Sequence, residues 1–393
     1  MLIWAGALVV GVVLGLLEIG WLDGVMNFVA TVYTRLFQLL AVPTIVLAVA
    51  TTLASLGSGS GRLFRHTVAY TLLTTAAASV VGLLLYVVIA PAALPAEVMA
   101  ADASASSPLA ADLSYADHLL SIIPNNIVKP FLEGNVLSLL LLAAAVGLAL
   151  SRMPESDSKS VVMKGLLGLQ ELLFLLIRGL VWTLPVGIVA FAAQLSAQLT
   201  AGVVADSLGR YVAVVLGGNV LQFFVVLPLF LLLRGLNPVR VLSRMMPAVL
   251  MALFTKSSAA TLPVTMDSAE QRLGVQTKVA RFVLPICTTI NMNGCAAFIL
   301  VTSLFVMQQG GIPLTWTTML TWLFVSIVSA VGNAGVPMGC YFLTLSLMSG
   351  IGAPVSVLGI ILPIYTIIDM VETAVNVWSD SCVAAMVNHD LEE

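Results

Sequence analysis

The chain has 393 residues and a formal net charge of −3; 60% of its residues are hydrophobic, 9% are charged, and its mean hydropathy is +1.08. Soluble globular domains usually carry about 25% charged residues. The composition therefore indicates an integral membrane protein and excludes an ordinary soluble domain, and no basic tract indicates a nucleic-acid partner.

The apolar segments, taken in chain order, predict eight membrane-spanning helices, because a helical span needs roughly 20 apolar residues. They lie near 1–22, 36–55, 67–93, 119–151, 163–198, 209–233, 279–308 and 355–387. Their long apolar runs do not alternate strictly, which favours helices over the strands of a barrel. We interpret the first segment as a retained helix, because no Lys or Arg precedes it as in a signal peptide.

The loops predict the orientation of the spans. Basic loops ("SGSGRLFRH", "SRMPESDSKSVVMK", "RGLNPVRVLSR") follow the second, fourth and sixth segments, whereas residues 92–118 hold no Lys or Arg. Since Lys and Arg in short loops mark the cytoplasmic side, we expect an external loop at 92–118, both termini in the cytoplasm and a location in the cell membrane.

Two further apolar segments, about 240–276 and 315–350, are broken by small and polar residues. Parity of the flanking spans requires each to enter and leave on the same side of the membrane. Irregular backbone at membrane depth is tolerated where it is buried or lines a cavity. We therefore predict two re-entrant hairpins with tips at "TKSSAATLP" and "VGNAGVP", as in inverted-repeat transporters with a midplane site.

The last apolar segment contains "DMVETAVNVWSD", residues 369–380. At 100° per residue, Asp369, Glu372, Thr373, Asn376 and Asp380 fall within an arc of roughly 100°. A carboxylate facing lipid costs about 2.5–3.5 kcal/mol on the insertion scale. We expect this stripe to face protein, water or bound cations.

Each of the two polar stretches, 369–380 and 287–297, has a second interpretation. The acids of the stripe could pair with basic groups inside the bundle, for which Lys256 and Arg178 are too few. In "CTTINMNGCAA" (287–297), Asn291, Asn293 and Gly294 predict an unwound helix whose carbonyls bind a small cation. A hydrogen bond between asparagines of neighbouring helices is the other interpretation.

Four motifs carry a family resemblance: "TKSSAATLPVTM", "TTINMNGCA", "VGNAGVP" and "DMVETAVNVWSD". In this order they resemble the first re-entrant tip, the unwound helix, the second tip and the last helix of the dicarboxylate/amino acid:cation symporters, the glutamate-transporter homologues. The resemblance implies an all-α, elevator-type membrane protein that is a homotrimer in the lipid bilayer. The implied domains are a scaffold at 1–60 and 94–200, the latter with the external loop, and a mobile transport domain at 61–93 and 205–388.

The resemblance also implies residue roles. Asp369 would hold the α-amino group of an amino acid, and Asn376 its α-carboxylate. The implied substrate-binding set is Ser258, Cys295, Val336, Pro337, Cys340, Asp369, Glu372, Thr373 and Asn376. The implied sodium-binding set is Thr74, Thr75, Cys287, Thr289, Asn291, Asn293, Ala330, Val331, Asn333, Asn376 and Asp380. The first sodium site would use Asp380 with carbonyls of Cys287, Asn291 and Asn376, the second Thr289 with the backbone of Ala330, Val331 and Asn333, and the third Thr74, Thr75 and the Asn291 side chain. Lys256 would balance charge at the first tip.

Two residues depart from the family pattern. Glu372 stands where acidic-amino-acid carriers have an Arg that clamps the side-chain carboxylate. A like-charge pair at 4 Å costs about 4 kcal/mol at an effective dielectric of 20. We therefore expect a neutral substrate such as serine or threonine; a cationic substrate, an acidic one, and pairing of Glu372 with Lys256 remain open. Asn293 replaces an Asp of the third sodium site, which predicts fewer sodium ions or coupling to a proton.

Other function classes have weaker support. Lys256 beside Ser257 could be a Ser–Lys nucleophile, but adjacent helical residues do not face each other, and an ion channel would not need three acids along one helix. The absence of a nucleotide loop indicates a gradient as the energy source. We expect the cysteines to be small hydrophobic residues without a disulfide framework or metal site, and the histidines to be solvated. These residues are Cys287, Cys295, Cys340, Cys382, His66, His118 and His389.

Overall fold

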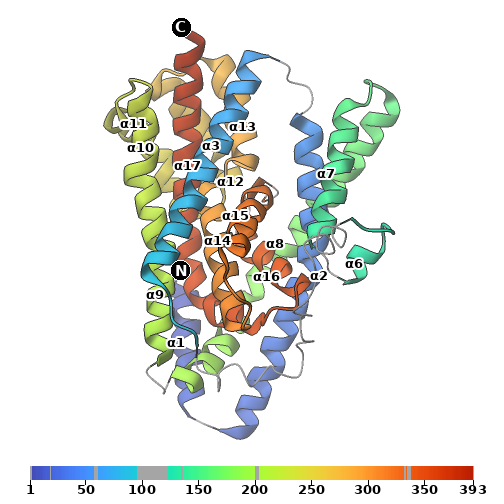
Figure 1. The fold of residues 1–393 in the computed structure, drawn as a ribbon, viewed down its shortest axis with the longest axis vertical. Coiled ribbons are helices and arrows are strands. Elements are labelled where there is room, and N and C mark those ends of the chain that lie inside the picture. The colour runs from blue at the N-terminus through green and yellow to red at the C-terminus, as the bar shows by residue number, and fades with distance from the viewer. Residues whose placement is uncertain are drawn as a thin grey trace.

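The computed structural model describes residues 2–17, 19–56, 61–94, 123–133, 136–199, 203–331, 333 and 338–392 (Figure 1). Within these ranges all regular secondary structure is helical, which agrees with the predicted all-α class. Residues 95–118 of the expected external loop, among them His118, lie outside these ranges.

The N-terminal half of the described chain contains six helices. They are α1 (Leu2–Leu16), α2 (Gly20–Leu56), α3 (Arg62–Ile89), α6 (Lys129–Glu133), α7 (Val136–Arg152) and α8 (Asp157–Leu199). Helix α2 is longer than the apolar segment near 36–55, because it begins at Gly20 and continues through Pro43. Its apolar character weakens near its N-terminal end, where Asp23 and Asn27 lie, so hydropathy alone missed the beginning of the helix.

The C-terminal half is a longer series of helices with short connections. It consists of α9 (Val203–Leu221), η1 (Gln222–Val226), α10 (Leu227–Leu233), α11 (Pro238–Thr255), α12 (Ser258–Asp267), η2 (Ser268–Leu273), α13 (Thr277–Ile290), α14 (Asn293–Gln309), α15 (Trp316–Val331), α16 (Gly339–Gly350) and α17 (Ser356–Glu392). The elements η1 and η2 are single π-helical turns, of the kind that often accompanies functional sites.

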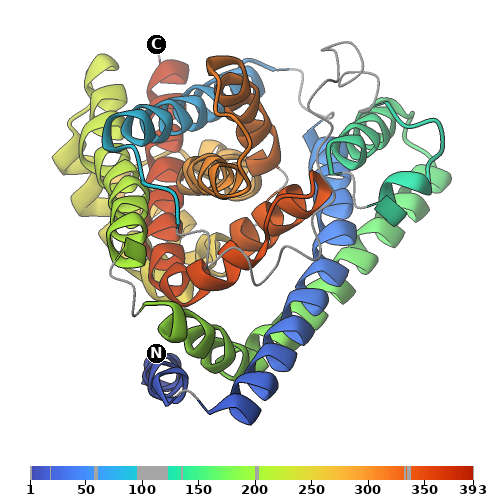
Figure 2. The same cartoon turned by 60° about the horizontal axis from the view of Figure 1, so that its bottom comes forward.

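The helices pack as two groups (Figures 1 and 2). In the first, α1 packs against α8, and α7 packs against α2, which also contacts α8. In the second, α3, α9, α15, α16 and α17 pack against α14, and α10 to α13 pack against α17. The groups meet where α16 contacts α2 and α7 and where α17 contacts α8. Helix α14 is buried over most of its length, so the polar residues at its start lie inside protein.

Five helical stretches of the described chain are long and apolar enough to cross a bilayer. They are Arg62–Ile89, Asp206–Leu233, Pro238–Thr255, Thr277–Gln309 and Ser356–Leu391. Shorter apolar helices lie at Leu141–Arg152 and Trp316–Val331. The predicted number of eight spans, and their orientation, stay predictions.

The first broken segment folds as two packed helices, α11 and α12, with the reversal at Lys256 and Ser257. Lys256 has a left-handed backbone (φ 54°), which ends α11. Ser257 caps α12 by accepting a hydrogen bond from the backbone N–H of Ala260 at 3.2 Å. The break lies where the sequence predicted it; entry and exit on one membrane side remain a prediction.

The second broken segment contains α15 and α16, and both pack against α14. Helix α16 also contacts α2 of the first helix group (Figure 2). Most of the predicted tip, including Val336 and Pro337, lies outside the described residues, while Asn333 and Met338 on either side of residues 334–337 are described.

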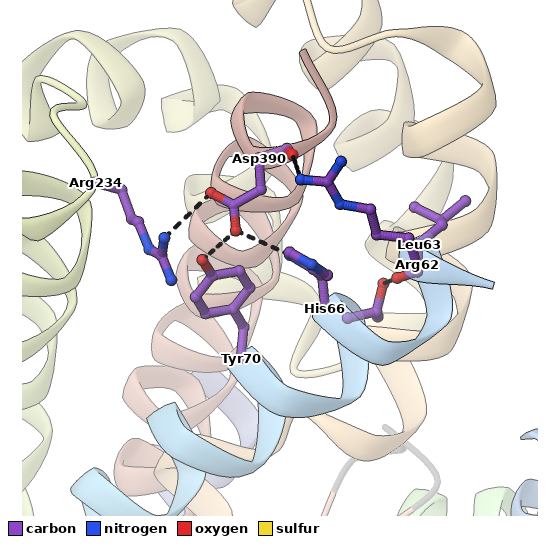
Figure 3. A network of polar contacts seen from close by, with 7 residues as sticks. Arg62, Leu63, His66, Tyr70, Arg234 and Asp390 are labelled. Carbon is purple, nitrogen blue, oxygen red and sulfur yellow. Dashed lines mark hydrogen bonds and ion pairs between the residues drawn. The ribbon is translucent and has the colours of Figure 1, made fainter. Parts of the chain in front are cut away.

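A polar network ties the C-terminal end of α17 to α3 and to the end of α10 (Figure 3). The Asp390 carboxylate accepts hydrogen bonds from Tyr70 and from His66 Nδ1 (2.9 Å), and Arg234 lies 3.5 Å away as an ion-pair partner. Arg62 donates to the backbone carbonyl of Asp390 at 3.0 Å. The prediction that His66 is merely solvated was therefore wrong, and α17 extends into what the sequence indicated as a polar tail.

Candidate functional site

Helix α17 carries the polar stripe on a face that is buried in protein. The exposed fractions are 3% for Asp369, 1% for Glu372, 5% for Thr373, 3% for Asn376 and 2% for Asp380. No residue of this stretch interrupts the helix, so the side chains keep the spacing from which one face was predicted. The expectation that the stripe faces protein is confirmed.

The predicted helix break lies opposite this stripe. Asn291 and Met292 are not helical, and they separate α13 from α14. A Cβ atom on Gly294 would lie 2.8 Å from the Cα of Glu372 and 2.9 Å from the side-chain oxygen of Asn219. Glycine is therefore what allows the start of α14 to approach the backbone of α17 this closely.

Asn376 is held in one orientation by the start of α14. Its Oδ1 accepts a hydrogen bond from the backbone N–H of Gly294 at 2.9 Å, and its Nδ2 donates to Cys295 Sγ at 3.3 Å. The Thr373 hydroxyl donates to the backbone carbonyl of Asp369 at 2.7 Å. Asn376 thus presents a fixed amide donor beside the carboxylates, which is the group needed to bind a substrate carboxylate.

Tyr365 links the two carboxylates nearest the N-terminal end of the stripe. Its hydroxyl lies 3.4 Å from Asp369 Oδ1 and 3.2 Å from Glu372 Oε2, and a hydroxyl can donate to one of them at a time. Asp369 Oδ2 also accepts from the backbone N–H of Met338 at 3.3 Å. Among the described residues, Glu372 Oε1 has no hydrogen-bond partner. Sequence reasoning missed Tyr365, although its spacing of four and seven residues places it on the same helix face.

The first hairpin brings a positive charge toward this site. Lys256 interacts electrostatically with Asp369. Ser258, the first residue of α12, is 2% exposed. The charge-balancing role of Lys256 and its alternative pairing with Glu372 remain predictions.

The amides of the break form a closed network with α3 and α17. Asn291 Oδ1 accepts from Thr74 at 3.0 Å, and Asn293 Oδ1 accepts from Thr75 at 2.9 Å. Both amides donate to Ser379 Oγ, at 2.9 and 2.7 Å. These polar atoms are hydrogen-bonded to one another. Sequence reasoning did not include Ser379, because its place on the stripe face gives no sign of which neighbour it meets.

Asp380 is the carboxylate closest to the break. Its Oδ1 accepts from Asn291 Nδ2 at 2.9 Å, and the backbone carbonyl of Cys287 accepts from Asn291 N at 2.8 Å. A carboxylate, an amide oxygen and main-chain carbonyls are hard oxygen ligands of the kind that alkali cations take. The structure thus places Asp380 beside Asn291, and the role of these residues as sodium ligands stays a prediction.

The residues of the second predicted sodium site lie on two helices. Thr289 is part of α13, Ala330 and Val331 end α15, and Asn333 follows α15. Helices α13 and α15 contact each other. The Thr289 hydroxyl donates to the carbonyl of Ile286 at 2.8 Å, and the carbonyl of Ala330 accepts from Asn333 N at 3.0 Å. Val331 is the last residue of α15. Their role as ligands stays a prediction.

Two cysteines contradict the sequence prediction. Cys295 at the start of α14 and Cys340 at the start of α16 form a disulfide, so these two are not simply small hydrophobic residues. Asn333 Nδ2 donates to both sulfur atoms, at 3.0 Å each. The remaining cysteines, Cys287 and Cys382, are free and buried, as expected.

Comparison with known proteins identifies the family of the chain. The model of the sodium:dicarboxylate symporter family matches residues 2–390. The neutral amino acid transporter B(0) of Oryctolagus cuniculus is 30% identical over 390 residues, covering 90% of this chain and 72% of the relative. The human neutral amino acid transporter A is 28% identical, covering 93% and 76%. The excitatory amino acid transporter 1 of Ambystoma tigrinum is 25% identical, covering 92% and 77%.

These relatives are transporters, which removes the Ser–Lys enzyme interpretation. The match covers both helix groups and all of the motifs from which the resemblance was drawn. The chain therefore belongs to the sodium:dicarboxylate symporter family, and it is a membrane transporter and not an enzyme.

Proposed function

We propose that the chain is a secondary transporter that couples uptake of a neutral amino acid to a sodium gradient. The observation that carries this proposal is the buried stripe of α17, in which Asp369, Asn376 and Asp380 are joined by Glu372 in place of a cationic clamp. The names of the most similar relatives, which include neutral and excitatory amino acid transporters, support an amino acid as the cargo.

The two ends of an amino-acid backbone match two groups of the site. The carboxylate of Asp369 accepts from Tyr365 and Met338 and has roughly four lone-pair sites, so acceptor capacity remains for an α-ammonium group. Asn376 presents its Nδ2 to the same region because Gly294 holds its Oδ1. A carboxylate bound there would displace the weak contact of Asn376 with Cys295.

Glu372 selects the substrate side chain. Its Oε1 has no partner among the described residues, so a hydroxyl or amide of a bound amino acid would satisfy it. A carboxylate side chain would instead meet two like charges, those of Glu372 and Asp369. Serine and threonine are the small neutral amino acids that supply a donor to this oxygen.

The sodium ions are co-substrates, and the residues around Asp380 fit one of them. This carboxylate supplies the negative charge, and the break between α13 and α14 supplies oxygen ligands. The third site implied by the resemblance fits less well. Asn293 offers Thr75 and this site an amide oxygen without a negative charge, which supports transport with fewer sodium ions. Coupling to a proton, carried by Glu372, is the alternative.

The remaining family features belong to the same proposal. We assign α1, α2, α7 and α8 to a scaffold and α3 with α9 to α17 to a mobile transport domain. The two packed groups of helices support this division. An elevator movement, two re-entrant hairpins and a homotrimer complete the proposed mechanism.

Uptake by proteoliposomes tests the function. We expect radiolabelled serine to accumulate under an inward sodium gradient, unlabelled threonine to compete, and aspartate to compete poorly. Replacing sodium by choline while imposing a pH gradient separates sodium coupling from proton coupling. Asp369→Asn should abolish uptake, whereas Asp206→Asn, which removes an exposed carboxylate paired with Arg210, should retain it. Equal uptake with and without any cation gradient would contradict the proposal.

A further inference from the structure

Three side chains that offer ligand atoms for a soft metal converge in the site. The sulfur atoms of Cys295 and Cys340 and a carboxylate oxygen of Glu372 lie within 4.8 Å of one another. Their residues are 4%, 2% and 1% exposed. Glu372 Oε1 has no hydrogen-bond partner among the described residues, so this oxygen is available as a ligand atom.

The two sulfur atoms are joined as a disulfide in the structure, so metal binding requires the reduced chain. A dithiol reductant supplies two electrons and two protons, giving two protein thiols and its own disulfide. Tetrahedral zinc with Zn–S bonds near 2.3 Å separates two sulfur ligands by about 3.8 Å. The Cα atoms lie 5.5 Å apart, a spacing from which side-chain rotation can reach that separation.

The surroundings suit thiolates. Asn333 Nδ2 lies 3.0 Å from each sulfur atom, and Asn376 Nδ2 lies 3.3 Å from that of Cys295. Amide donors stabilise the negative charge of thiolate ligands and fix their positions, as outer-shell groups do in metal sites. Metal binding releases the two thiol protons, so the divalent metal ion is bound by three negatively charged groups, two thiolates and one carboxylate.

We propose that the reduced chain binds a thiophilic divalent cation, such as zinc, through Cys295, Cys340 and Glu372, with a fourth position open. Soft sulfur ligands separate this site from the sodium sites, whose ligands are oxygen atoms. The metal would occupy the space in front of Glu372 and thereby exclude the amino-acid side chain. This exclusion rests on the proposed function, whereas metal binding itself does not.

Cadmium titration of the full chain tests the site. The purified protein is reduced in detergent with a phosphine, alkylation and mass spectrometry verify the free thiols, and cadmium is added without oxygen. We expect one cadmium per chain, read from its thiolate charge-transfer absorption, and displacement of that signal by zinc. The signal should disappear in Cys295→Ser and in Cys340→Ser, and at least tenfold more cadmium should be needed in Glu372→Gln.

Cys382→Ser is the matched control, because this cysteine is free and buried in another part of the core. It should bind cadmium as the unchanged chain does, and thermal unfolding without metal shows which variants are folded. Three results would overturn the proposal: no thiolate signal in the reduced chain, an unchanged signal in folded Cys340→Ser, or a disulfide that persists after reduction.

A competition experiment between cadmium and serine tests separately whether the bound metal excludes the amino acid. Adding serine with sodium should raise the cadmium concentration needed for half-saturation at least tenfold, and zinc should inhibit serine uptake. Cadmium binding that is indifferent to serine, in a chain that transports serine, would refute the exclusion. If the metal-free chain takes up no amino acid in either its oxidised or its reduced form, the proposed function fails while the titration still decides the metal site.

Discussion

Glu372→Gln is the substitution that isolates the charge of the proposed specificity residue. The two side chains have nearly the same shape, and the oxygen that accepts from Tyr365 is kept. Gly294, whose Cβ position lies against the backbone of residue 372, is not affected by a change of side chain. Loss of the negative charge is therefore the main difference between the two proteins.

Coulomb's law gives the magnitude. An aspartate side chain in the site would bring its carboxylate to about 4–6 Å from Glu372, where repulsion at an effective dielectric of 20 is about 3–4 kcal/mol. Each 1.4 kcal/mol corresponds to a factor of ten in affinity. After allowance for relaxation of the site, we expect the affinity ratio of aspartate to serine to rise at least 50-fold.

Thermal-shift titrations with serine and aspartate at fixed sodium measure this ratio directly, because a ligand stabilises the folded state by RT ln(1 + [L]/Kd). Glu155→Gln, which removes a carboxylate with 88% exposure, is the control and should leave the ratio unchanged. A change of less than threefold in Glu372→Gln would refute the charge argument.

Three further predictions concern the proposed ion site, the close approach of α14 to α17 and the Asp390 network. Asp380→Asn should raise the sodium concentration for half-maximal serine uptake at least tenfold; an unchanged sodium dependence would remove Asp380 from the ion site. Gly294→Ala places a Cβ 2.8 Å from backbone and should destabilise the protein by about 1–3 kcal/mol, whereas Gly209→Ala, which meets nothing within 4 Å, should not. Asp390→Asn weakens the contacts with Tyr70, His66 and Arg234 and should lower the melting temperature by several degrees, as about 1–2 kcal/mol implies. Asp206→Asn, in an exposed pair, should leave the melting temperature within about one degree, and equal shifts would contradict the assigned role of Asp390.

Periodicity and the cost of burying charge support the most reliable predictions from the sequence. The stripe of α17 was predictable because three carboxylates on one face of an apolar helix cannot face lipid. The break between α13 and α14 was predictable because Asn291, Asn293 and Gly294 interrupt an otherwise apolar helix. Both predictions depend on local spacing, which the fold leaves unchanged.

Long-range contacts were not predictable in the same way. Cys295 and Cys340 are 45 residues apart and carry no paired spacing, so their meeting depends on how α16 packs against α14. Tyr365 has a hydroxyl among many apolar neighbours, and its partners become apparent in the folded helix. The Asp390 network joins residues more than 300 positions apart, from Arg62 to Asp390.

Helix α17 is an unbroken rod of 37 residues, and Asp369 and Asp380 are both part of it. At 1.5 Å per residue, the two carboxylates are about 16 Å apart along its axis. No shift of the rod can carry one of them across the bilayer and leave the other behind. The proposed amino-acid site at Asp369 and the proposed sodium site at Asp380 would therefore move together, so uptake of the amino acid without sodium would require that one site be empty while both move.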